Sequence, residues 1–178
     1  VRATLPARVQ LVLAANPCPC GNANTSDALE PCRCTPSTRV RYLNRLSGPL
    51  TDRIDLRLQV RRVSTVLRHA IDAVPPNNST ELRKRVIDAR AAMSDRLAGT
   101  PWTVNADVPG HWLRGSSWAL PKSATAVLDH ALSRGSLTLR GYDRTLRLAW
   151  TIADLAGKNS PGRDDLAHAL ALRGGAAA

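Results

Sequence analysis

Residues 9–20 read VQLVLAANPCPC, and the fold of the N-terminal third of the chain depends on this stretch. Its first part, residues 9–15, is an apolar run with Gln10 as the one polar residue, and it stops at Asn16-Pro17. A short apolar run that ends at such a turn signal is typical of a strand buried on both faces, as in a parallel sheet. We therefore expect residues 9–15 to form a strand of an α/β sheet.

Cysteines follow this run in two tight pairs, and the chain has no others. Each pair can supply two adjacent corners of a tetrahedral Zn²⁺ site, which takes deprotonated sulfur at about 2.3 Å. Because four thiolates leave no open coordination position, the predicted zinc is structural rather than catalytic. Two alternatives remain open here, namely disulfides, which need an oxidising compartment, and free buried thiols. The four predicted ligands are Cys18, Cys20, Cys32 and Cys34.

Downstream of the cysteines, the hydrophobic periodicity predicts one helix and a second strand. The helix is expected after Pro36 and ends at residues 47–49, which read Ser-Gly-Pro. Residues 54–60 alternate apolar and polar side chains, which is the period of a strand. The apolar positions are Val40, Leu43 and Leu46 in the helix, and Ile54, Leu56, Leu58 and Val60 in the strand.

From residue 79 onward the pattern predicts only helices. Ser79 or Thr80 can cap the first one, the third runs from about 141 to 157, and the last follows Pro161. Apolar residues at helical spacing mark the face of each helix that is expected to be buried. In chain order these are Leu82, Val86, Ala89, Met93 and Leu97; Ala124, Val127, Leu128, Ala131 and Leu132; Leu148, Ile152 and Leu155; and Leu166, Ala169 and Leu170.

Residues 99–120 are expected to be irregular, because they contain Pro101, Pro109 and Gly110. Three tryptophans fall in this stretch, and such residues either stack on nucleic-acid bases or anchor a loop to the core. We favour the anchor. The three are Trp102, Trp112 and Trp118.

These patterns predict a mainly α fold with a partial α/β portion. Residues 1–62 would end an α/β core that carries the zinc-binding insertion at 18–34, residues 63–78 would be a linker, and residues 79–178 a helical domain. Two strands cannot form a doubly wound sheet alone, and the phosphate-loop motif G-x-x-x-x-G-K-[ST] does not occur. We expect the chain to be the C-terminal piece of a longer protein and to bind no nucleotide in the phosphate-loop manner by itself.

Composition and charge narrow the possible partners. The chain has 25 Lys and Arg against 14 Asp and Glu, which gives a formal net charge of +11. A basic surface favours phosphate-bearing partners such as DNA, although a general use of Arg would give the same balance. No stretch approaches the ~20 apolar residues of a membrane span, and the first ten residues do not form a signal peptide. The sequence therefore predicts a cytoplasmic protein that does not interact with membranes.

Three segments carry recognisable motifs. They read ANPCPCG at residues 15–21, YLNRLSGPLTDRID at 42–55, and RGYDRTLRLA at 140–149, the last followed by TIADLAG at 151–157. Together they closely resemble the magnesium-chelatase-like AAA+ ATPases of the YifB/ComM family over essentially the whole chain. The resemblance implies the C-terminal end of an AAA+ core with a four-cysteine zinc loop, followed by a helical lid. It also implies ATP and Mg²⁺ as cofactors of the full-length protein, which is expected to form a homo-oligomeric ring, specifically a hexamer.

The resemblance assigns catalytic roles to two residues. Asn16 corresponds to sensor 1, which hydrogen-bonds the γ-phosphate or orients the attacking water. Arg53 corresponds to the arginine finger, whose guanidinium stabilises charge on the phosphoryl group bound by a neighbouring subunit. The alternative for Asn16 is an ordinary strand end, and the alternative for Arg53 is a surface side chain paired with Asp52 or Asp55.

Sensor 2, a further contact to the nucleotide phosphates, is implied at the start of the third predicted helix. Arg140, Arg144 and Arg147 are its candidates, with Arg140 and Arg144 preferred. The alternative is a solvated basic face. Trp150 stands where relatives often carry another Arg, so the basic pattern is not fully retained.

Three functions remain to be distinguished. The resemblance favours ATP-driven DNA remodelling, with branch migration in the recombination of incoming DNA during natural transformation. The namesake activity is an alternative, in which an ATPase subunit drives insertion of Mg²⁺ into a porphyrin. A third hypothesis is a zinc-stabilised nucleic-acid-binding module without motor activity. Because the fragment lacks the phosphate loop, it should be inactive as an ATPase alone.

Overall fold

A computed structural model describes residues 3, 9–23, 31–60, 78–115 and 118–174, and these residues are mainly helical. The chain divides into two compact units, Val1–Ser47 and Gly48–Ala178. The predicted linker at 63–78 lies almost wholly outside the described residues. The helices are α1 (Pro36–Leu43), α2 (Gly48–Thr51), α4 (Ser79–Leu97), the 3-10 helix η1 (Asn105–Asp107), α5 (Gly110–Gly115), α6 (Lys122–Ser133), α7 (Leu139–Leu155) and α8 (Arg163–Gly174).

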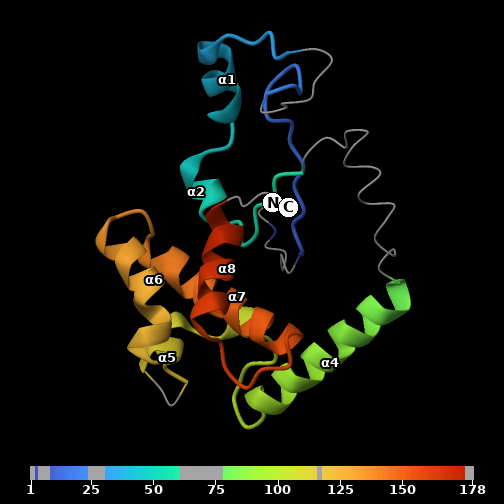
Figure 1. The fold of residues 1–178 in the computed structure, drawn as a ribbon, viewed down its shortest axis with the longest axis vertical. Coiled ribbons are helices and arrows are strands. Elements are labelled where there is room, and N and C mark those ends of the chain that lie inside the picture. Colours follow the sequence, from blue (N-terminus) through green and yellow to red (C-terminus); the bar gives the residue numbers. More distant parts are fainter. Residues whose placement is uncertain (1–2, 4–8, 24–30, 61–77, 116–117, 175–178) are drawn as a thin grey trace. The chain divides into compact units, whose positions relative to one another are not determined.

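Helix α7 is the centre of the second unit, and α4, η1, α5, α6 and α8 all pack against it (Figure 1). Its N-cap is Thr138, whose side chain accepts a hydrogen bond from the backbone N–H of Gly141 at 3.0 Å. The buried positions recur with the helical period and form one continuous stripe. They are Gly141, Tyr142, Thr145, Leu146, Ala149, Trp150, Ala153 and Asp154.

The prediction of this helix is confirmed, and its predicted apolar face is confirmed in part. Leu148 and Ile152 are partly buried and pack against the core, whereas Leu155 is 40% exposed. The fully buried stripe also contains small residues such as Ala149 and Ala153, which let neighbouring helices approach closely.

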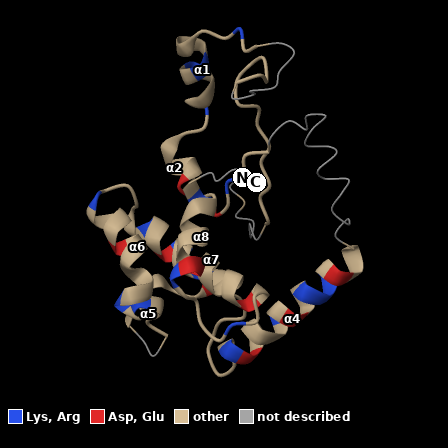
Figure 2. Ribbon diagram, in the orientation of Figure 1, with Lys and Arg blue, Asp and Glu red and all other residues tan. Residues whose placement is uncertain are grey.

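Helix α4 joins the core through its C-terminal half, where Ala89 and Leu97 are buried. Its predicted apolar face is confirmed there, but Leu82 and Val86 near its N-terminus are 42% and 44% exposed. The N-cap is Asn78 rather than Ser79 or Thr80, since Asn78 Oδ1 accepts from the N–H of Thr80 at 2.9 Å. Basic and acidic residues are interspersed along this helix (Figure 2). None of the described helices is long and apolar enough to cross a membrane.

The stretch 99–120 contains η1 and α5 and is therefore less irregular than predicted. Its tryptophans pack against the core and against each other, with ring centroids 5.0 Å apart for Trp102–Trp112 and 4.7 Å for Trp112–Trp118. Trp118 in turn lies 5.4 Å from Trp150 of α7. The anchoring role of these residues is confirmed, because edge-to-face contacts join the three rings to one another and the tilted Trp118–Trp150 contact joins them to α7.

A buried ion pair ties α4 to α7 beneath these rings. Arg96 contacts the carboxylate of Asp154, and the two side chains are only 14% and 3% exposed. Asn105 of η1 joins them, accepting from Arg96 at 2.8 Å and donating to Asp154 at 3.0 Å. The guanidinium also lies over the Trp150 ring, 4.5 Å from its centroid. Asn105 thus supplies a third partner to the pair, while Arg96 Nε is buried without a hydrogen-bond partner among the described residues.

In the first unit, helix α1 is confirmed after Pro36 and is capped by Thr35, which accepts from the N–H of Thr38 at 3.2 Å. It ends at Leu43, before the predicted Ser-Gly-Pro stop, with Asn44 as its C-cap.

The two predicted strands are wrong for the described residues. Residues 9–15 form no regular strand, and Val9 and Val12 are 78% and 82% exposed. Residues 54–60 contain only an isolated bridge at Gln59, with Val60 87% exposed. A strand is stabilised by hydrogen bonds to its neighbours, and no described segment provides a paired ladder for these two. Apolarity and alternation predict the extended conformation, but they say nothing about its partner.

Candidate functional site

The four cysteines converge in the first unit, as their spacing predicted. Their sulfur atoms all lie within 4.8 Å of one another, and the measured separations are 3.3 Å for Cys18–Cys20, 3.7 Å for Cys18–Cys32 and 3.6 Å for Cys20–Cys32. All four are free thiols, and these distances far exceed the length of a disulfide bond of about 2.05 Å. The fourth member of the cluster is Cys34.

The turn after Cys20 shapes this cluster. Gly21 adopts a φ of 80°, a left-handed conformation that favours glycine, and its N–H donates to the carbonyl of Cys18 at 3.0 Å. The chain then folds back so that the N–H of Ala23 donates to Cys18 Sγ at 3.3 Å. Backbone donors aimed at sulfur stabilise a thiolate, which is the form that binds a metal.

The thiol pKa values reflect this crowding. The backbone N–H of Asn22, together with the Cys18 thiol, lowers the pKa of Cys20 to about 6. At Cys34 the backbone N–H of Cys20 acts in the same lowering direction, but the Cys20 side chain, burial and the other thiols outweigh it and raise the pKa to about 11. A thiolate at one cysteine thus disfavours a second thiolate beside it, and a bound divalent cation would offset this repulsion between negative charges.

The donor set fits a tetrahedral metal. Four Zn–S bonds of 2.3 Å place neighbouring sulfurs about 3.8 Å apart, close to the 3.3–3.7 Å separations measured among Cys18, Cys20 and Cys32. An all-sulfur tetrahedron selects zinc or an iron–sulfur centre over the oxygen-preferring Mg²⁺ and Ca²⁺. The four cysteines could therefore hold a metal ion.

Asn16, the predicted sensor 1, also lies in the first unit. It is exposed and lies immediately before the bend at Pro17 that leads into the cysteine cluster. The predicted nucleotide-binding arginines belong to the other unit. Its role therefore stays a prediction.

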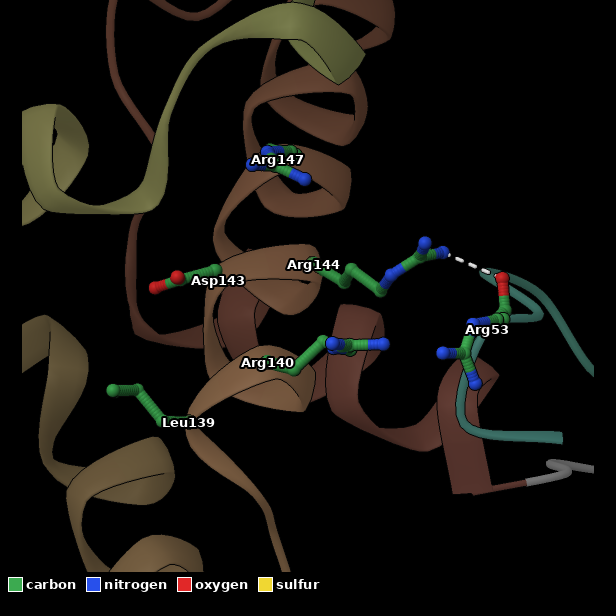
Figure 3. A pocket seen from close by; sticks show the side chains of 6 residues that line it. All are labelled: Arg53, Leu139, Arg140, Asp143, Arg144 and Arg147. Carbon is green, nitrogen blue, oxygen red and sulfur yellow. Dashed lines mark hydrogen bonds between the residues drawn. The ribbon is translucent and has the colours of Figure 1, made fainter. Parts of the chain in front are cut away.

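The predicted arginines of the second unit line one pocket of about 420 Å³. Arg140 and Arg144 extend from the first turns of α7 toward Arg53, which follows α2 (Figure 3). Arg147 lies one turn further along the helix (Figure 3). Because four guanidinium groups surround it, the pocket suits an anion with several oxygen atoms, such as a phosphate chain. Its other lining residues are Leu139 and Asp143.

Two of these arginines are held by other parts of the protein. Arg144 Nη1 donates to the carbonyl of Arg53 at 2.6 Å and pairs with Asp55 at 2.5 Å. Arg147 Nε donates to the carbonyl of Val108 at 2.8 Å. Burial, and next the positive charge of Arg144, lower the pKa of Arg147. The like charges therefore repel within the pocket, and an anion would relieve that repulsion.

Arg140 and Arg53 are more open. Arg140 is exposed, and among the described residues no hydrogen bond or ion pair of its side chain is found. Arg53 is also exposed, and its Nη1 donates to the carbonyl of Pro49 at 2.7 Å. The carboxylates near Arg53 pair with other arginines, Asp55 with Arg144 and Asp52 with Arg173. Both open guanidinium groups keep donors for an incoming ligand.

Sequence reasoning missed two residues around this pocket. Asp143 lines it and pairs with Arg114 of α5. Arg173, near the end of α8, is 8% exposed and contacts the chain beside Arg53, with Nη1 3.2 Å from the carbonyl of Ile54. Arg173 lies 119 positions from Ile54. No local motif could have indicated it.

Comparison with known proteins places both units in one family. The family described as "Magnesium chelatase, subunit ChlI" matches residues 1–67, and "Magnesium chelatase, subunit ChlI C-terminal" matches residues 76–173. An uncharacterized protein of Mycobacterium tuberculosis is 47% identical over 172 residues, covering 96% of this chain and 32% of the relative. The competence protein ComM of Haemophilus influenzae is 35% identical over 169 residues, which cover 94% of this chain and 31% of the relative. The uncharacterized protein YifB of Escherichia coli is 34% identical over 171 residues, which cover 96% of this chain and 32% of the relative. The chain spans about a third of the length of these relatives.

Proposed function

The chain belongs to the magnesium chelatase ChlI family, and on this premise we propose that it is the C-terminal part of a ring-forming AAA+ ATPase that remodels DNA. ATP and Mg²⁺ would bind in the full-length protein, which would act in the cytoplasm as a hexameric ring. ATP-driven branch migration during recombination of incoming DNA is the activity we favour. The name of the relative ComM, a competence protein, supports this choice, as does the net charge of +11.

The observation that supports ATP hydrolysis most directly is the arginine pocket. Among the described residues Arg140 keeps its guanidinium open at the pocket wall, and we assign it the sensor 2 contact to the phosphates of the nucleotide. Arg144 pairs with Asp55, and Arg147 donates to the carbonyl of Val108. We therefore assign these two arginines a supporting role in the pocket wall. Arg53 would reach the nucleotide of a neighbouring subunit and stabilise charge on the transferred phosphoryl group. Asn16 would orient the attacking water.

The cysteine cluster would hold structural zinc. Its four sulfurs satisfy a tetrahedral ion completely, so the metal would tie Cys18 and Cys20 to Cys32 and Cys34 and take no part in hydrolysis. Zinc binding would deprotonate all four thiols and release their protons.

A second candidate function is the one in the family description. A magnesium chelatase subunit would use the same pocket to drive insertion of Mg²⁺ into a porphyrin, with no need for DNA. The two functions therefore differ in what stimulates turnover.

ATP hydrolysis by the full-length protein, with and without single-stranded and branched DNA, separates these functions. We expect DNA to stimulate turnover. Arg53→Ala should nearly abolish hydrolysis while leaving ATP binding intact, and Arg140→Ala should weaken ATP binding. Arg134→Ala, at an exposed position after α6, is the matched control. Turnover indifferent to DNA would favour the chelatase, and unchanged turnover in Arg53→Ala would remove the arginine-finger assignment.

A further inference from the structure

The segment that carries Arg53 is held by side chains from two helices of the same unit. Arg144 of α7 makes the first attachment, with Nη1 at 2.6 Å from the carbonyl of Arg53 and at 2.5 Å from the Asp55 carboxylate. Figure 3 shows Arg144 extending from the helix toward this carbonyl. A single guanidinium thus binds the backbone of Arg53 and the side chain two residues later.

Helix α8 makes the second attachment. Arg173 Nη1 donates to the carbonyl of Ile54 at 3.2 Å, and Nη2 lies 3.7 Å from the Asp52 carboxylate. The N–H of Arg57 donates to the carbonyl of Leu172 at 2.8 Å, which satisfies one of the free carbonyls at the end of α8. The backbone from Arg53 to Arg57 is therefore fixed to the helices, and Asp52, just before it, is held through its side chain.

The two pairs differ in how far solvent reaches them. The Arg173 side chain is 7% exposed and Asp52 33%, whereas Arg144 is 23% exposed and Asp55 66%, so solvent screens the Arg173 pair less than the Arg144 pair. Both interactions involve an ionised donor, which roughly doubles the strength of a hydrogen bond. We call this set of groups, formed by Arg144, Arg173, Asp52 and Asp55, the arginine clamp.

We propose that the arginine clamp positions Arg53 for hydrolysis, with Asp55 and Arg144 as positioning residues that act on the backbone of Arg53. This rests on the proposed ATPase function and goes beyond it, because it gives Arg144 a partner within the chain in place of the nucleotide. A finger that reaches a neighbouring subunit must hold its guanidinium in place, and an error of about 1 Å can cost a hundredfold in rate. Two attachments flanking Arg53 supply that constraint.

The test uses steady-state ATP hydrolysis by the full-length protein. Asp55→Asn and Arg144→Gln are each expected to lower kcat about 10- to 100-fold with little change in KM for ATP. The double variant should be no worse than Arg144→Gln alone, because that substitution already removes the contact with Asp55. Asp55→Glu should recover part of the loss. Asp88→Asn, on an exposed face of α4, is the matched control and should turn over like the wild type.

Folding is checked separately by the urea midpoint of tryptophan fluorescence, and Arg144→Lys keeps the charge where Arg144→Gln proves unstable. Normal turnover in a folded Asp55→Asn protein would overturn the clamp and leave the ATPase function standing. A raised KM in Arg144→Gln, with Asp55→Asn unaffected, would also overturn it and make Arg144 a phosphate contact. Absence of turnover in the wild type would instead overturn the proposed function, and the clamp with it.

Discussion

Asp165 is a buried carboxylate in the first turn of α8, and its surroundings favour the ionised form. Burial acts to raise its pKa, but Lys158 Nζ donates to both carboxylate oxygens, at 2.8 and 3.0 Å, and the N–H of Gly162 donates at 2.8 Å. These bonds, with the charges of Lys158 and His168, hold the pKa of Asp165 below its usual value of 3.8. The folded protein therefore takes up this proton less readily than the unfolded chain. The carboxylate stabilises the fold above the unfolded pKa, and that stability is lost as the pH falls through the folded pKa.

Asp165→Asn is accordingly expected to lower the free energy of unfolding at pH 7 by about 1–3 kcal/mol. The deficit should shrink as the pH falls below about 4, because the wild type then loses the same contribution. Urea unfolding followed by tryptophan fluorescence measures it. The matched control is Asp164→Asn, on the exposed neighbouring residue. A deficit of equal size at pH 7 and pH 3 would contradict a role for the ionised form.

Individual roles are what the sequence predicted least well. The motif at 140–149 indicated a group of arginines, and the structure places Arg140, Arg144 and Arg147 at one pocket. Which guanidinium stays open depends on partners far along the chain, since Asp55 lies 89 positions from Arg144, and Val108 lies 39 from Arg147. No local pattern contains that information. The cysteines were easier, because a tight pair constrains its own geometry.

At the scale of helices, α5 and α7 meet where glycine is required. A Cβ atom added to Gly110 would overlap the carboxylate of Asp143, which pairs with Arg114. The methyl group of alanine would push that carboxylate aside and disrupt the ion pair that links the two helices. Gly110→Ala should therefore lower the free energy of unfolding by about 1–3 kcal/mol, the usual cost of overpacking. The measurement is again urea unfolding.

Gly115→Ala provides the matched comparison for this helix. It introduces the same methyl group at the other end of α5, where nothing lies within 4 Å of the added atom. We expect a change within about 0.5 kcal/mol, as for ordinary surface substitutions. Equal effects of the two substitutions would mean that the backbone of α5, and not its contact with Asp143, sets the cost.

The longer helices were predictable from the sequence, whereas the short helices α2, η1 and α5 and the two strands were not, and for the strands there is a physical reason. A helix such as α7 satisfies its backbone within its own residues, so an apolar period and a cap at Thr138 suffice to indicate it. Residues 9–15 and 54–60 need hydrogen-bond partners from elsewhere. Their sequence patterns are compatible with a sheet, but the described residues contain no neighbouring strand with which they could pair.

Across the whole molecule, the two units differ in what can stabilise them. The second unit has a hydrophobic core around α7. In the first unit, the buried apolar residues among those described are only Cys18 and Ala23. So small a core supplies little stability, and small domains of this kind usually depend on a metal or a disulfide. Because all four thiols are free, a bound metal rather than a disulfide is the candidate for stabilising the first unit.

Metal removal tests this division. We expect about one zinc ion per chain after purification without added metal, and we expect EDTA or Cys20→Ser to expose residues 18–34 to protease. The physical reason is that structural zinc contributes about 10–16 kcal/mol to folding in isolated zinc fingers, far more than two buried side chains can replace.

All four tryptophans lie between residues 102 and 150, so the urea midpoint of their fluorescence reports on the core of the second unit and should stay unchanged. Four freely titrating thiols without zinc, or a protease pattern indifferent to EDTA, would contradict the metal. A shifted tryptophan midpoint would instead show that the cysteine cluster also stabilises the helical unit.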